Sequence, residues 1–215
     1  SVGAYAGTTC TGIYGVSIGA YAANSVGTSG YYTAIGSHAG NNHSKDGGHD
    51  GWIAIGRKSQ DVTNGINISI GYHAMHSGTT GTEALNVSDG NVVIGDYAMG
   101  RNSGSNDTDN LLTNNYNTVV GNGLSGEAPM GVAISANYNS IFGYKGGSAL
   151  TTGDDNIIIG YSAINLTTGS DNVVIGNYAG NALTTEQSQL FIGYKAGQHT
   201  ISASRALHIG YYAGL

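Results

Sequence analysis

The stretch from Thr151 to Thr185 reads TTGDDNIIIGYSAINLTTGSDNVVIGNYAGNALTT. It holds two copies of one pattern, in which Asn precedes three β-branched residues and a Gly, with Ala three places after that Gly. β-Branched residues favour a pleated strand, and a Gly directly after so short a run favours a sharp corner. Each copy therefore predicts one short strand followed by a turn.

The same pattern recurs along the whole chain. An apolar residue followed by Gly occurs about twelve times in 215 residues, with the motif glycines at positions 3, 19, 36, 56, 71, 95, 121, 143, 160, 176, 193 and 210. Self-similarity at such a period is typical of a solenoid. We predict an all-β parallel β-solenoid (β-roll) of about twelve coils with loop insertions. Residues 1–215 form a single repeat domain, with regular coils over 1–71 and 143–215 and insertion-rich coils over 72–142.

The composition excludes several other classes. The chain has 37 Gly but one Pro, no Gly period of three, 40% hydrophobic residues and only 9% charged residues. These values argue against collagen, against disorder and against a helical bundle. A net charge of −6 argues against a nucleic-acid partner, and no apolar run is long enough for membrane insertion. Cys10 stands alone and cannot form an internal disulfide.

Asn stands four residues before the motif Gly in six successive repeats. These residues are Asn67, Asn91, Asn117, Asn139, Asn156 and Asn172. In coils stacked about 4.8 Å apart, their amides would bond along the stack, so we interpret them as a scaffold ladder. In several repeats both faces of the strand are apolar, so one face fills the coil and the other needs a cover. We expect the chain to associate with itself.

Over Thr151 to Thr185 the sequence resembles the Asn-x-x-x-Ile-Gly-x-x-Ala repeats in the shafts of bacteriophage tail fibres. It is also similar to the head repeats of trimeric autotransporter adhesins, loosely over the whole chain and closely from Phe142 to Leu215. The resemblance implies a left-handed β-roll, three chains packed around an axis, and a surface that binds host molecules. It also implies an extracellular place, on a virion or a cell surface. Neither end shows a polar cap, so a head-to-tail filament is expected as an alternative to a homotrimer.

Tyr recurs in the corner after the motif Gly and would align as an aromatic stripe. We name six of these residues as contacts for a glycan, a receptor or a partner chain: Tyr97, Tyr144, Tyr161, Tyr178, Tyr194 and Tyr211. Packing between chains and glycan binding both remain open for this stripe.

Three groups of residues offer metal ligands, although no cofactor is required. His43, Asp46, His49 and Asp50 could bind a divalent transition metal, and His73 with His76 form a weaker pair of the same kind. Residues 106–110 offer oxygen ligands for Ca²⁺ but lack the Gly and Glu of an EF-hand loop. A solvated polar loop is the alternative for the first and the third group.

Enzyme-like strings are explained by the repeat itself. Ser17 lies in a G-x-S-x-G string but no helix follows it, and the G-x-G-x-x-G string at 121–126 lacks a βαβ context. We predict a non-enzymatic extracellular fibre protein, with a structural shaft and an adhesive surface that contacts a receptor or a glycan.

Three alternatives stay open beside the fibre. The first is a subunit of a self-polymerising extracellular filament, with its Asn-x-Ser/Thr sequons as glycosylation sites. The second is a carbohydrate-active enzyme on a β-helix, using Asp154, Asp155 and Asp171. The third is an ice-binding solenoid built on the threonine pairs 151–152, 167–168 and 184–185.

Overall fold

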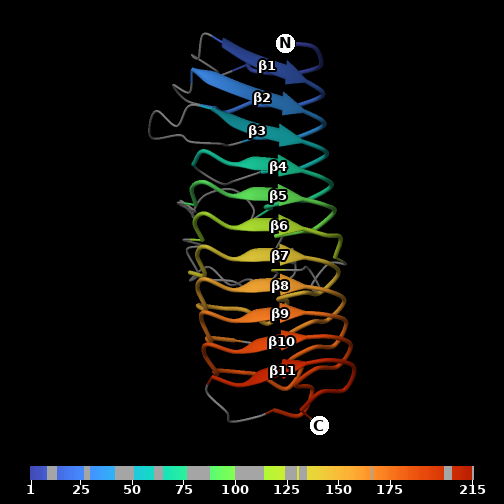
Figure 1. Ribbon diagram of the computed structural model, residues 1–215. Coiled ribbons are helices and arrows are strands. Elements are labelled where there is room, and N and C mark those ends of the chain that lie inside the picture. Colours follow the sequence, from blue (N-terminus) through green and yellow to red (C-terminus); the bar gives the residue numbers. More distant parts are fainter. Residues whose placement is uncertain are drawn as a thin grey trace.

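Within the part of the chain that the structure describes, eleven strands stack in one parallel sheet, in the order in which they occur in the sequence (Figure 1). The structure, a computed structural model, describes residues 1–8, 14–26, 30–41, 51–60, 65–76, 88–99, 114–123, 130, 135–165, 167–200 and 205–214. It confirms the predicted all-β parallel β-solenoid. It has about eight complete turns instead of the twelve predicted coils, although the twelve motif copies correspond to eleven strands and one isolated bridge at Val2.

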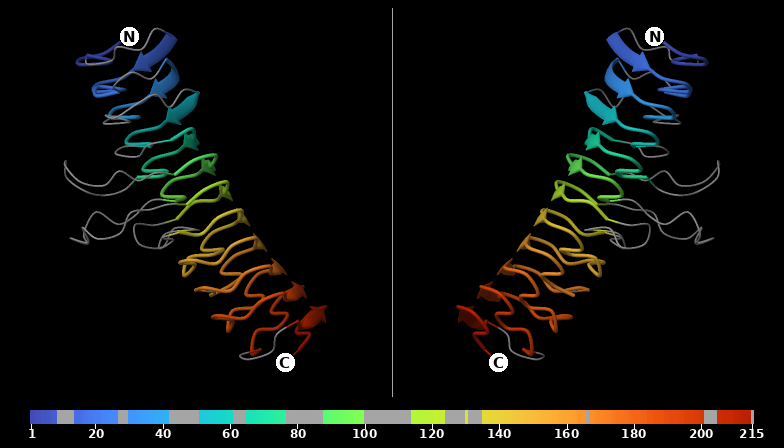
Figure 2. Two further views of the ribbon diagram at one scale, coloured as in Figure 1. Left: turned by 90° about the vertical axis from the view of Figure 1, so that its left-hand side faces the viewer. Right: turned by 90° about the vertical axis from the view of Figure 1, so that its right-hand side faces the viewer.

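The strands are short, and the first three are the longest. They are β1 (Tyr14–Ile18), β2 (Tyr31–Ile35), β3 (Trp52–Ile55), β4 (Ile68–Ile70), β5 (Val92–Ile94), β6 (Thr118–Val120), β7 (Ser140–Phe142), β8 (Ile157–Ile159), β9 (Val173–Ile175), β10 (Leu190–Ile192) and β11 (Leu207–Ile209). All run in the same direction, so the sheet has a leading edge where strands begin and a trailing edge where they end. These edges lie on the left and the right of Figure 1, and the chain termini lie at opposite ends of the stack (Figures 1 and 2).

The register is continuous through the insertion-rich region. Ile70 of β4 pairs with Ile94 of β5, which pairs with Val120 of β6, which in turn pairs with Phe142 of β7. The spacing between motif glycines is longest here, yet each strand still ends at the same repeat position. The longer spacing therefore does not change the register of the strands.

The motif glycines form a column in which each packs on the next. Gly160 has φ +141°, and a Cβ placed on it would lie 2.6 Å from the carbonyl oxygen of Gly176 in the following coil. Its backbone N–H donates to the Phe142 carbonyl of the preceding strand at 2.9 Å. The equivalent bonds of Gly143 and Gly176 measure 2.9 and 2.8 Å. A side chain is excluded both by the left-handed backbone and by the close approach of the next coil.

The interior of the coil is filled by one residue from each strand. The second-last residue of every strand from β1 to β10 is fully buried: Ser17, Ala34, Ala54, Ser69, Val93, Val119, Ile141, Ile158, Val174 and Phe191. The buried apolar residues form two clusters, one around Trp52 and one extending from Ala74 to Ala196. Ser59 and Ser69 are buried between them, with their hydroxyls 2.8 Å apart.

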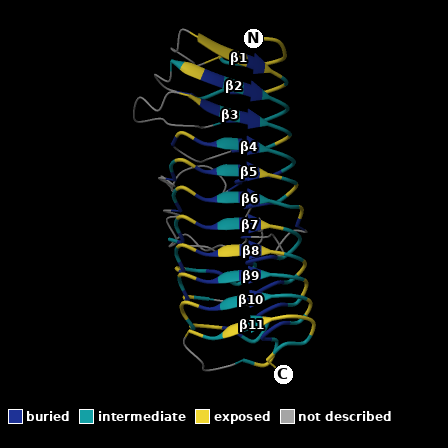
Figure 3. Cartoon of the chain, in the orientation of Figure 1, coloured by how far each residue is buried: buried dark blue, intermediate teal, exposed yellow. Residues whose placement is uncertain are grey.

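The outer face of the sheet carries mainly apolar side chains, and the residues at its outward positions are of intermediate burial or exposed (Figure 3). Its exposed members, 37–63% accessible, are Val16, Ile18, Ile94, Phe142, Ile157, Ile159, Leu207 and Ile209. Ten strand spacings of about 4.8 Å make this strip about 50 Å long. Among the described residues there is no helix with the length and apolar character that crossing a bilayer requires.

Candidate functional site

The six predicted asparagines lie one above another inside the coils and form a continuous ladder. Asn156 shows the pattern, because its Nδ2 donates to Asn139 Oδ1 at 3.0 Å and to the Gly169 carbonyl at 3.1 Å. Its Oδ1 accepts from the backbone N–H of Asn172 at 3.1 Å and from Asn172 Nδ2 at 2.9 Å. All six side chains are buried. Since every donor and acceptor of Asn156 is used within the stack, this column is scaffold rather than a ligand site.

Two parts of this scaffold were not identified from the sequence. Gln189 extends the ladder by one coil, since its Oε1 accepts from the Ala206 backbone N–H at 2.9 Å. A second column lies two residues earlier in the repeat, where each backbone N–H donates to a side-chain oxygen of the next coil. Its members are Asp89, Asn115, Asn137 and Asp154. The signal for both was a polar residue at a constant distance from the motif Gly.

The predicted tyrosines come from two repeat positions and do not form one stripe. Tyr144, Tyr161 and Tyr194 directly follow a motif Gly, whereas Tyr97 and Tyr178 stand one residue later, with positive φ. Tyr97 contacts Tyr72 and His73, at centroid distances of 5.3 and 5.1 Å. The following coil has Asn122 instead of Tyr directly after its motif Gly, so Tyr97 is separated from the other five tyrosines.

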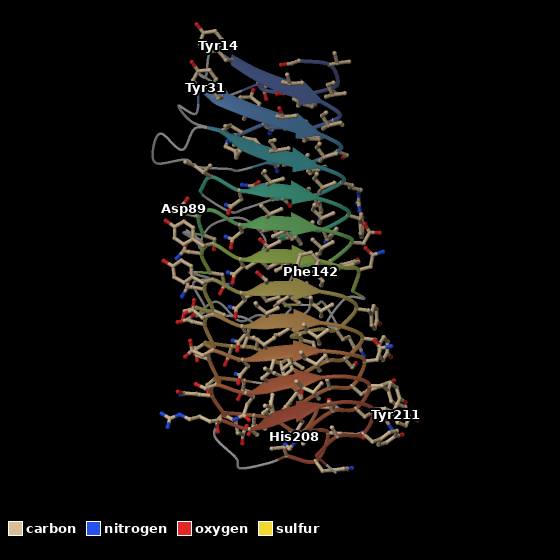
Figure 4. The ribbon with its side chains drawn as sticks, in the orientation of Figure 1. Tyr14, Tyr31, Asp89, Phe142, His208 and Tyr211 are labelled. Atoms are coloured by element: carbon tan, nitrogen blue, oxygen red, sulfur yellow. The ribbon has the colours of Figure 1, made fainter. Side chains whose placement is uncertain are left out.

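The other five tyrosines, together with Tyr212, form a continuous row along the trailing edge, which we call the tyrosine row. Tyr144 stacks on Tyr161 at 5.5 Å, and Tyr194 stacks on Tyr211 at 5.4 Å. Tyr178 is turned edge-on to its neighbours, with interplanar angles of 66° and 87°. Figure 4 shows Tyr211 projecting from this edge. Where rings stack face to face, their faces are covered, so the row presents mainly ring edges and hydroxyls to solvent.

Two lysines are integrated into the tyrosine row. Lys195 Nζ lies 5.5 Å from the ring centroid of Tyr194 and 5.2 Å from that of Tyr212, and Lys145 Nζ lies 5.7 Å from that of Tyr144. A hydrogen bond to the Tyr212 side chain raises the pKa of Lys195, so this ammonium stays charged at neutral pH. The row is therefore a cationic aromatic edge.

The leading edge carries a second set of tyrosines that the sequence prediction omitted. Tyr14 stacks on Tyr31 at 5.1 Å, and Tyr116 stacks on Tyr138 at 5.2 Å. All four rings are exposed by 56–64%. Figure 4 shows Tyr14 and Tyr31 at the side where the strands begin, opposite Tyr211. They stand five residues before a motif Gly, so their spacing could have identified them.

Of the three predicted groups of metal ligands, only the pair of His73 and His76 lies among the described residues. His43, Asp46, His49 and Asp50 lie outside the described residues, as does the 106–110 segment. His73 and His76 are brought together, with ring centroids 4.5 Å apart and both side chains buried. Burial, with added repulsion from Lys58 and Arg57, lowers the pKa of His73 to about 4. Within the described part of the chain, no group of three or more His, Cys, Asp or Glu side chains could hold a metal ion.

The residues of the enzyme and ice-binding alternatives have structural contacts of their own. Ser17 is buried, with its hydroxyl 3.0 Å from that of Tyr32. Asp154 accepts from the Asn137 backbone N–H at 2.7 Å, whereas Asp155 and Asp171 are exposed and share a repeat position. The Thr151 hydroxyl donates to the carbonyl of Thr167, the equivalent residue one coil later.

The sequons differ in exposure. Asn67 is a buried ladder residue, so its amide is inaccessible in the folded chain, whereas Asn165 is exposed. The remaining sequons, at positions 42, 86 and 106, lie outside the described residues.

Comparison of the chain with protein-family models, with curated proteins and with solved structures finds no match.

Proposed function

We propose that this chain is a non-enzymatic shaft protein of an extracellular fibre, at a virion or cell surface, and that its copies associate through the outer face of the sheet. The observation that carries the proposal is the apolar strip on that face. Ile157 and Ile159 flank a fully buried Ile158, yet they are themselves about 40% exposed. Contiguous apolar surface of this extent is typical of interaction sites rather than of monomeric proteins.

The repeat architecture supports a shaft. Each coil adds one strand to the sheet, and the coils of β4 to β9 each add one rung of the asparagine ladder, so the fold extends in one direction only. The sequence resemblance adds the expectation of a homotrimer. A head-to-tail filament is the alternative assembly and would use the ends of the stack instead of the apolar strip.

Oligomer size tests this proposal directly. Light scattering coupled to size exclusion, with negative-stain imaging, should show rods made of several copies. Ile157→Lys with Ile159→Lys places two charges in the apolar strip and should dissociate these rods while the coils stay folded, as monitored by circular dichroism. Asn165→Lys with His199→Lys adds the same charges at exposed positions outside the strands and away from the acidic leading edge, and should leave the rods intact. A wild-type chain that is monomeric at high micromolar concentration would refute the shaft.

We further propose that the tyrosine row contacts a receptor or a glycan. The phenolic hydroxyls and ring edges of this row suit hydroxyl-rich sugars. Tyr161→Ala with Tyr194→Ala should abolish binding to a panel of immobilised polysaccharides. Tyr116→Ala with Tyr138→Ala, which removes two exposed rings from the leading edge, is the matched control. Equal loss of polysaccharide binding in the two double variants would contradict a specific role of the tyrosine row.

A further inference from the structure

The charged side chains of the described residues divide between the two edges of the sheet by sign. Residues that follow strands, at the trailing edge, include four cations and one anion: Arg57, Lys58, Lys145, Lys195 and Asp96. Residues that precede strands, at the leading edge, include five anions and one cation: Asp89, Asp154, Asp155, Asp171, Glu186 and Arg205. The apolar strip therefore has a basic border on one side and an acidic border on the other.

Like charges along one border repel each other. Asp155 and Asp171 occupy the same position in successive coils, about 4.8 Å apart along the stack, and both are exposed. Like charges directly opposite each other on neighbouring strands are destabilising. An opposite charge brought alongside each border would remove this repulsion.

We propose that copies of this chain associate side by side in the same direction, with the acidic leading edge of one copy against the basic trailing edge of the next. The inference rests on the proposed association through the apolar strip, and it adds the orientation and the pairing of the edges. When two such sheets face each other with parallel axes, the leading edge of one lies beside the trailing edge of the other. With antiparallel axes, leading edge meets leading edge and anion meets anion.

Two of the four cations at the trailing edge have an anion of the leading edge near the same height along the stack. Lys145 follows β7 and Asp155 precedes β8, so they are one coil apart. Lys195 follows β10, and Glu186 precedes the same strand. In a parallel assembly in register, these oppositely charged groups lie within about one strand spacing of each other along the axis.

Engineered disulfides distinguish the two orientations. In a Cys10→Ser background, Lys145→Cys combined with Asp155→Cys should form covalent oligomers on mild oxidation, because each copy presents one thiol at each edge. Either substitution alone should give almost no covalent dimer. Efficient dimer formation by Asp155→Cys alone would show that leading edges meet and would overturn the proposal.

Charge reversal gives a second readout that does not depend on cysteine. At low salt, Lys145→Glu with Lys195→Glu should lower the association constant of the copies by about fivefold for each charge pair that is lost. Adding Asp155→Lys and Glu186→Lys should restore the association constant. Failure of the restored variant to recover while wild type assembles would overturn the edge pairing. Two outcomes separate the proposals: a monomeric wild type refutes the shaft itself, whereas an assembled chain with leading-edge dimers refutes only the orientation.

Discussion

The first three coils and the next seven carry different types of side chain at the same position of the repeat. Four residues before the motif Gly, strands β4 to β10 are preceded by Asn or Gln, whose amides bond along the stack. In the first three coils this position holds Gly15, Tyr32 and Trp52. Tyr32 and Trp52 stack inside the coil at 5.0 Å, and Gly15 leaves the space that the Tyr32 ring occupies. One backbone therefore accepts either an amide ladder or an aromatic stack.

The difference in filling also changes the strand. In six of the seven ladder coils, all except that of Asn67, the residue before the amide adopts positive φ, as at Asp155 (58°) and Asp171 (61°). This left-handed residue bends the chain before the strand, so only three residues remain extended. Tyr14 and Tyr31 at the same position are extended, so β1 and β2 reach five residues. The local ladder geometry thus shortens the strand that follows it.

The largest expected effect comes from removing the aromatic stack. Trp52→Ala empties a fully buried site beside Gly40, and we expect it to lower the free energy of unfolding of the first coils by about 4 kcal/mol. Hydrogen exchange resolved by segment, with urea denaturation, would measure the loss over β1–β3 and its decay along the stack.

Tyr31→Ala is the matched control for this substitution. Its ring is 56% exposed and stacks on Tyr14 at the leading edge, so its loss should cost less than about 1 kcal/mol. Equal effects of the two substitutions would mean that edge stacking, and not the buried ring pair, holds the first coils together.

The next effect tests the feature that both regions share. Gly36→Ala in the aromatic region and Gly160→Ala in the ladder region should each cost about 4 kcal/mol, about half from backbone strain and half from collision with the next coil. In both, an added Cβ would lie 2.6 Å from the next carbonyl oxygen. Gly210→Ala has the same left-handed backbone but open space, so urea denaturation should show about half the loss. A cost that differs between Gly36 and Gly160 would show that the two regions do not share one backbone.

The fold could be predicted from the sequence because strand, corner and glycine column repeat in phase. The aromatic stack could not, because it appears only where the pattern is broken. Gly15 and Tyr32 look unrelated in sequence, and their complementarity depends on the coils being stacked. The same holds at Gly90, where an added Cβ would meet the Tyr116 ring of the next coil at 2.5 Å. Size compensation across coils is a contact property that a repeat pattern does not encode.

The candidate site was predicted by residue type but not by arrangement. Tyr144 and Tyr178 were expected in one stripe, since both lie in the corner after the Gly. They differ by one residue in the repeat, and Tyr178 is consequently turned edge-on to its neighbours. The edge that each charge occupies follows only from the strand direction, so the charge separation emerged from the stacked structure.

A smaller effect is expected from interrupting the amide ladder. Asn156→Ala removes two donated and two accepted hydrogen bonds and leaves the Asn172 backbone N–H without its side-chain acceptor, at a cost of about 3 kcal/mol. Gln189→Ala removes the amide at the end of the ladder, where Oε1 accepts from the Ala206 N–H and Nε2 donates to the Gln187 carbonyl and not to a neighbouring amide, so a smaller loss is expected in urea denaturation. If the two variants were equally stable, the column would contribute packing rather than hydrogen bonding.

The smallest effect concerns the boundary between the two regions, where the apolar core is interrupted by buried Ser59, Ser69 and His73. Burial is the main cause that lowers the pKa of His73 to about 4, while the unfolded chain titrates near 6.5. Between these values the unfolded state binds a proton that the folded state does not, so stability should fall as the pH is lowered from about 6.5 to 4. We expect a loss of about 2 kcal/mol, less than the full shift implies because Arg57 is solvent-screened.

Thermal unfolding followed across this pH window would reveal the loss, and His73→Gln should flatten its pH dependence. His199→Gln, at an exposed position, should leave the dependence as in wild type. Segment-resolved hydrogen exchange should place the acid-induced opening around β4, between the aromatic coils and the ladder coils. Opening that begins instead at the far end, near β11, would show that the boundary is no weaker than the rest of the stack.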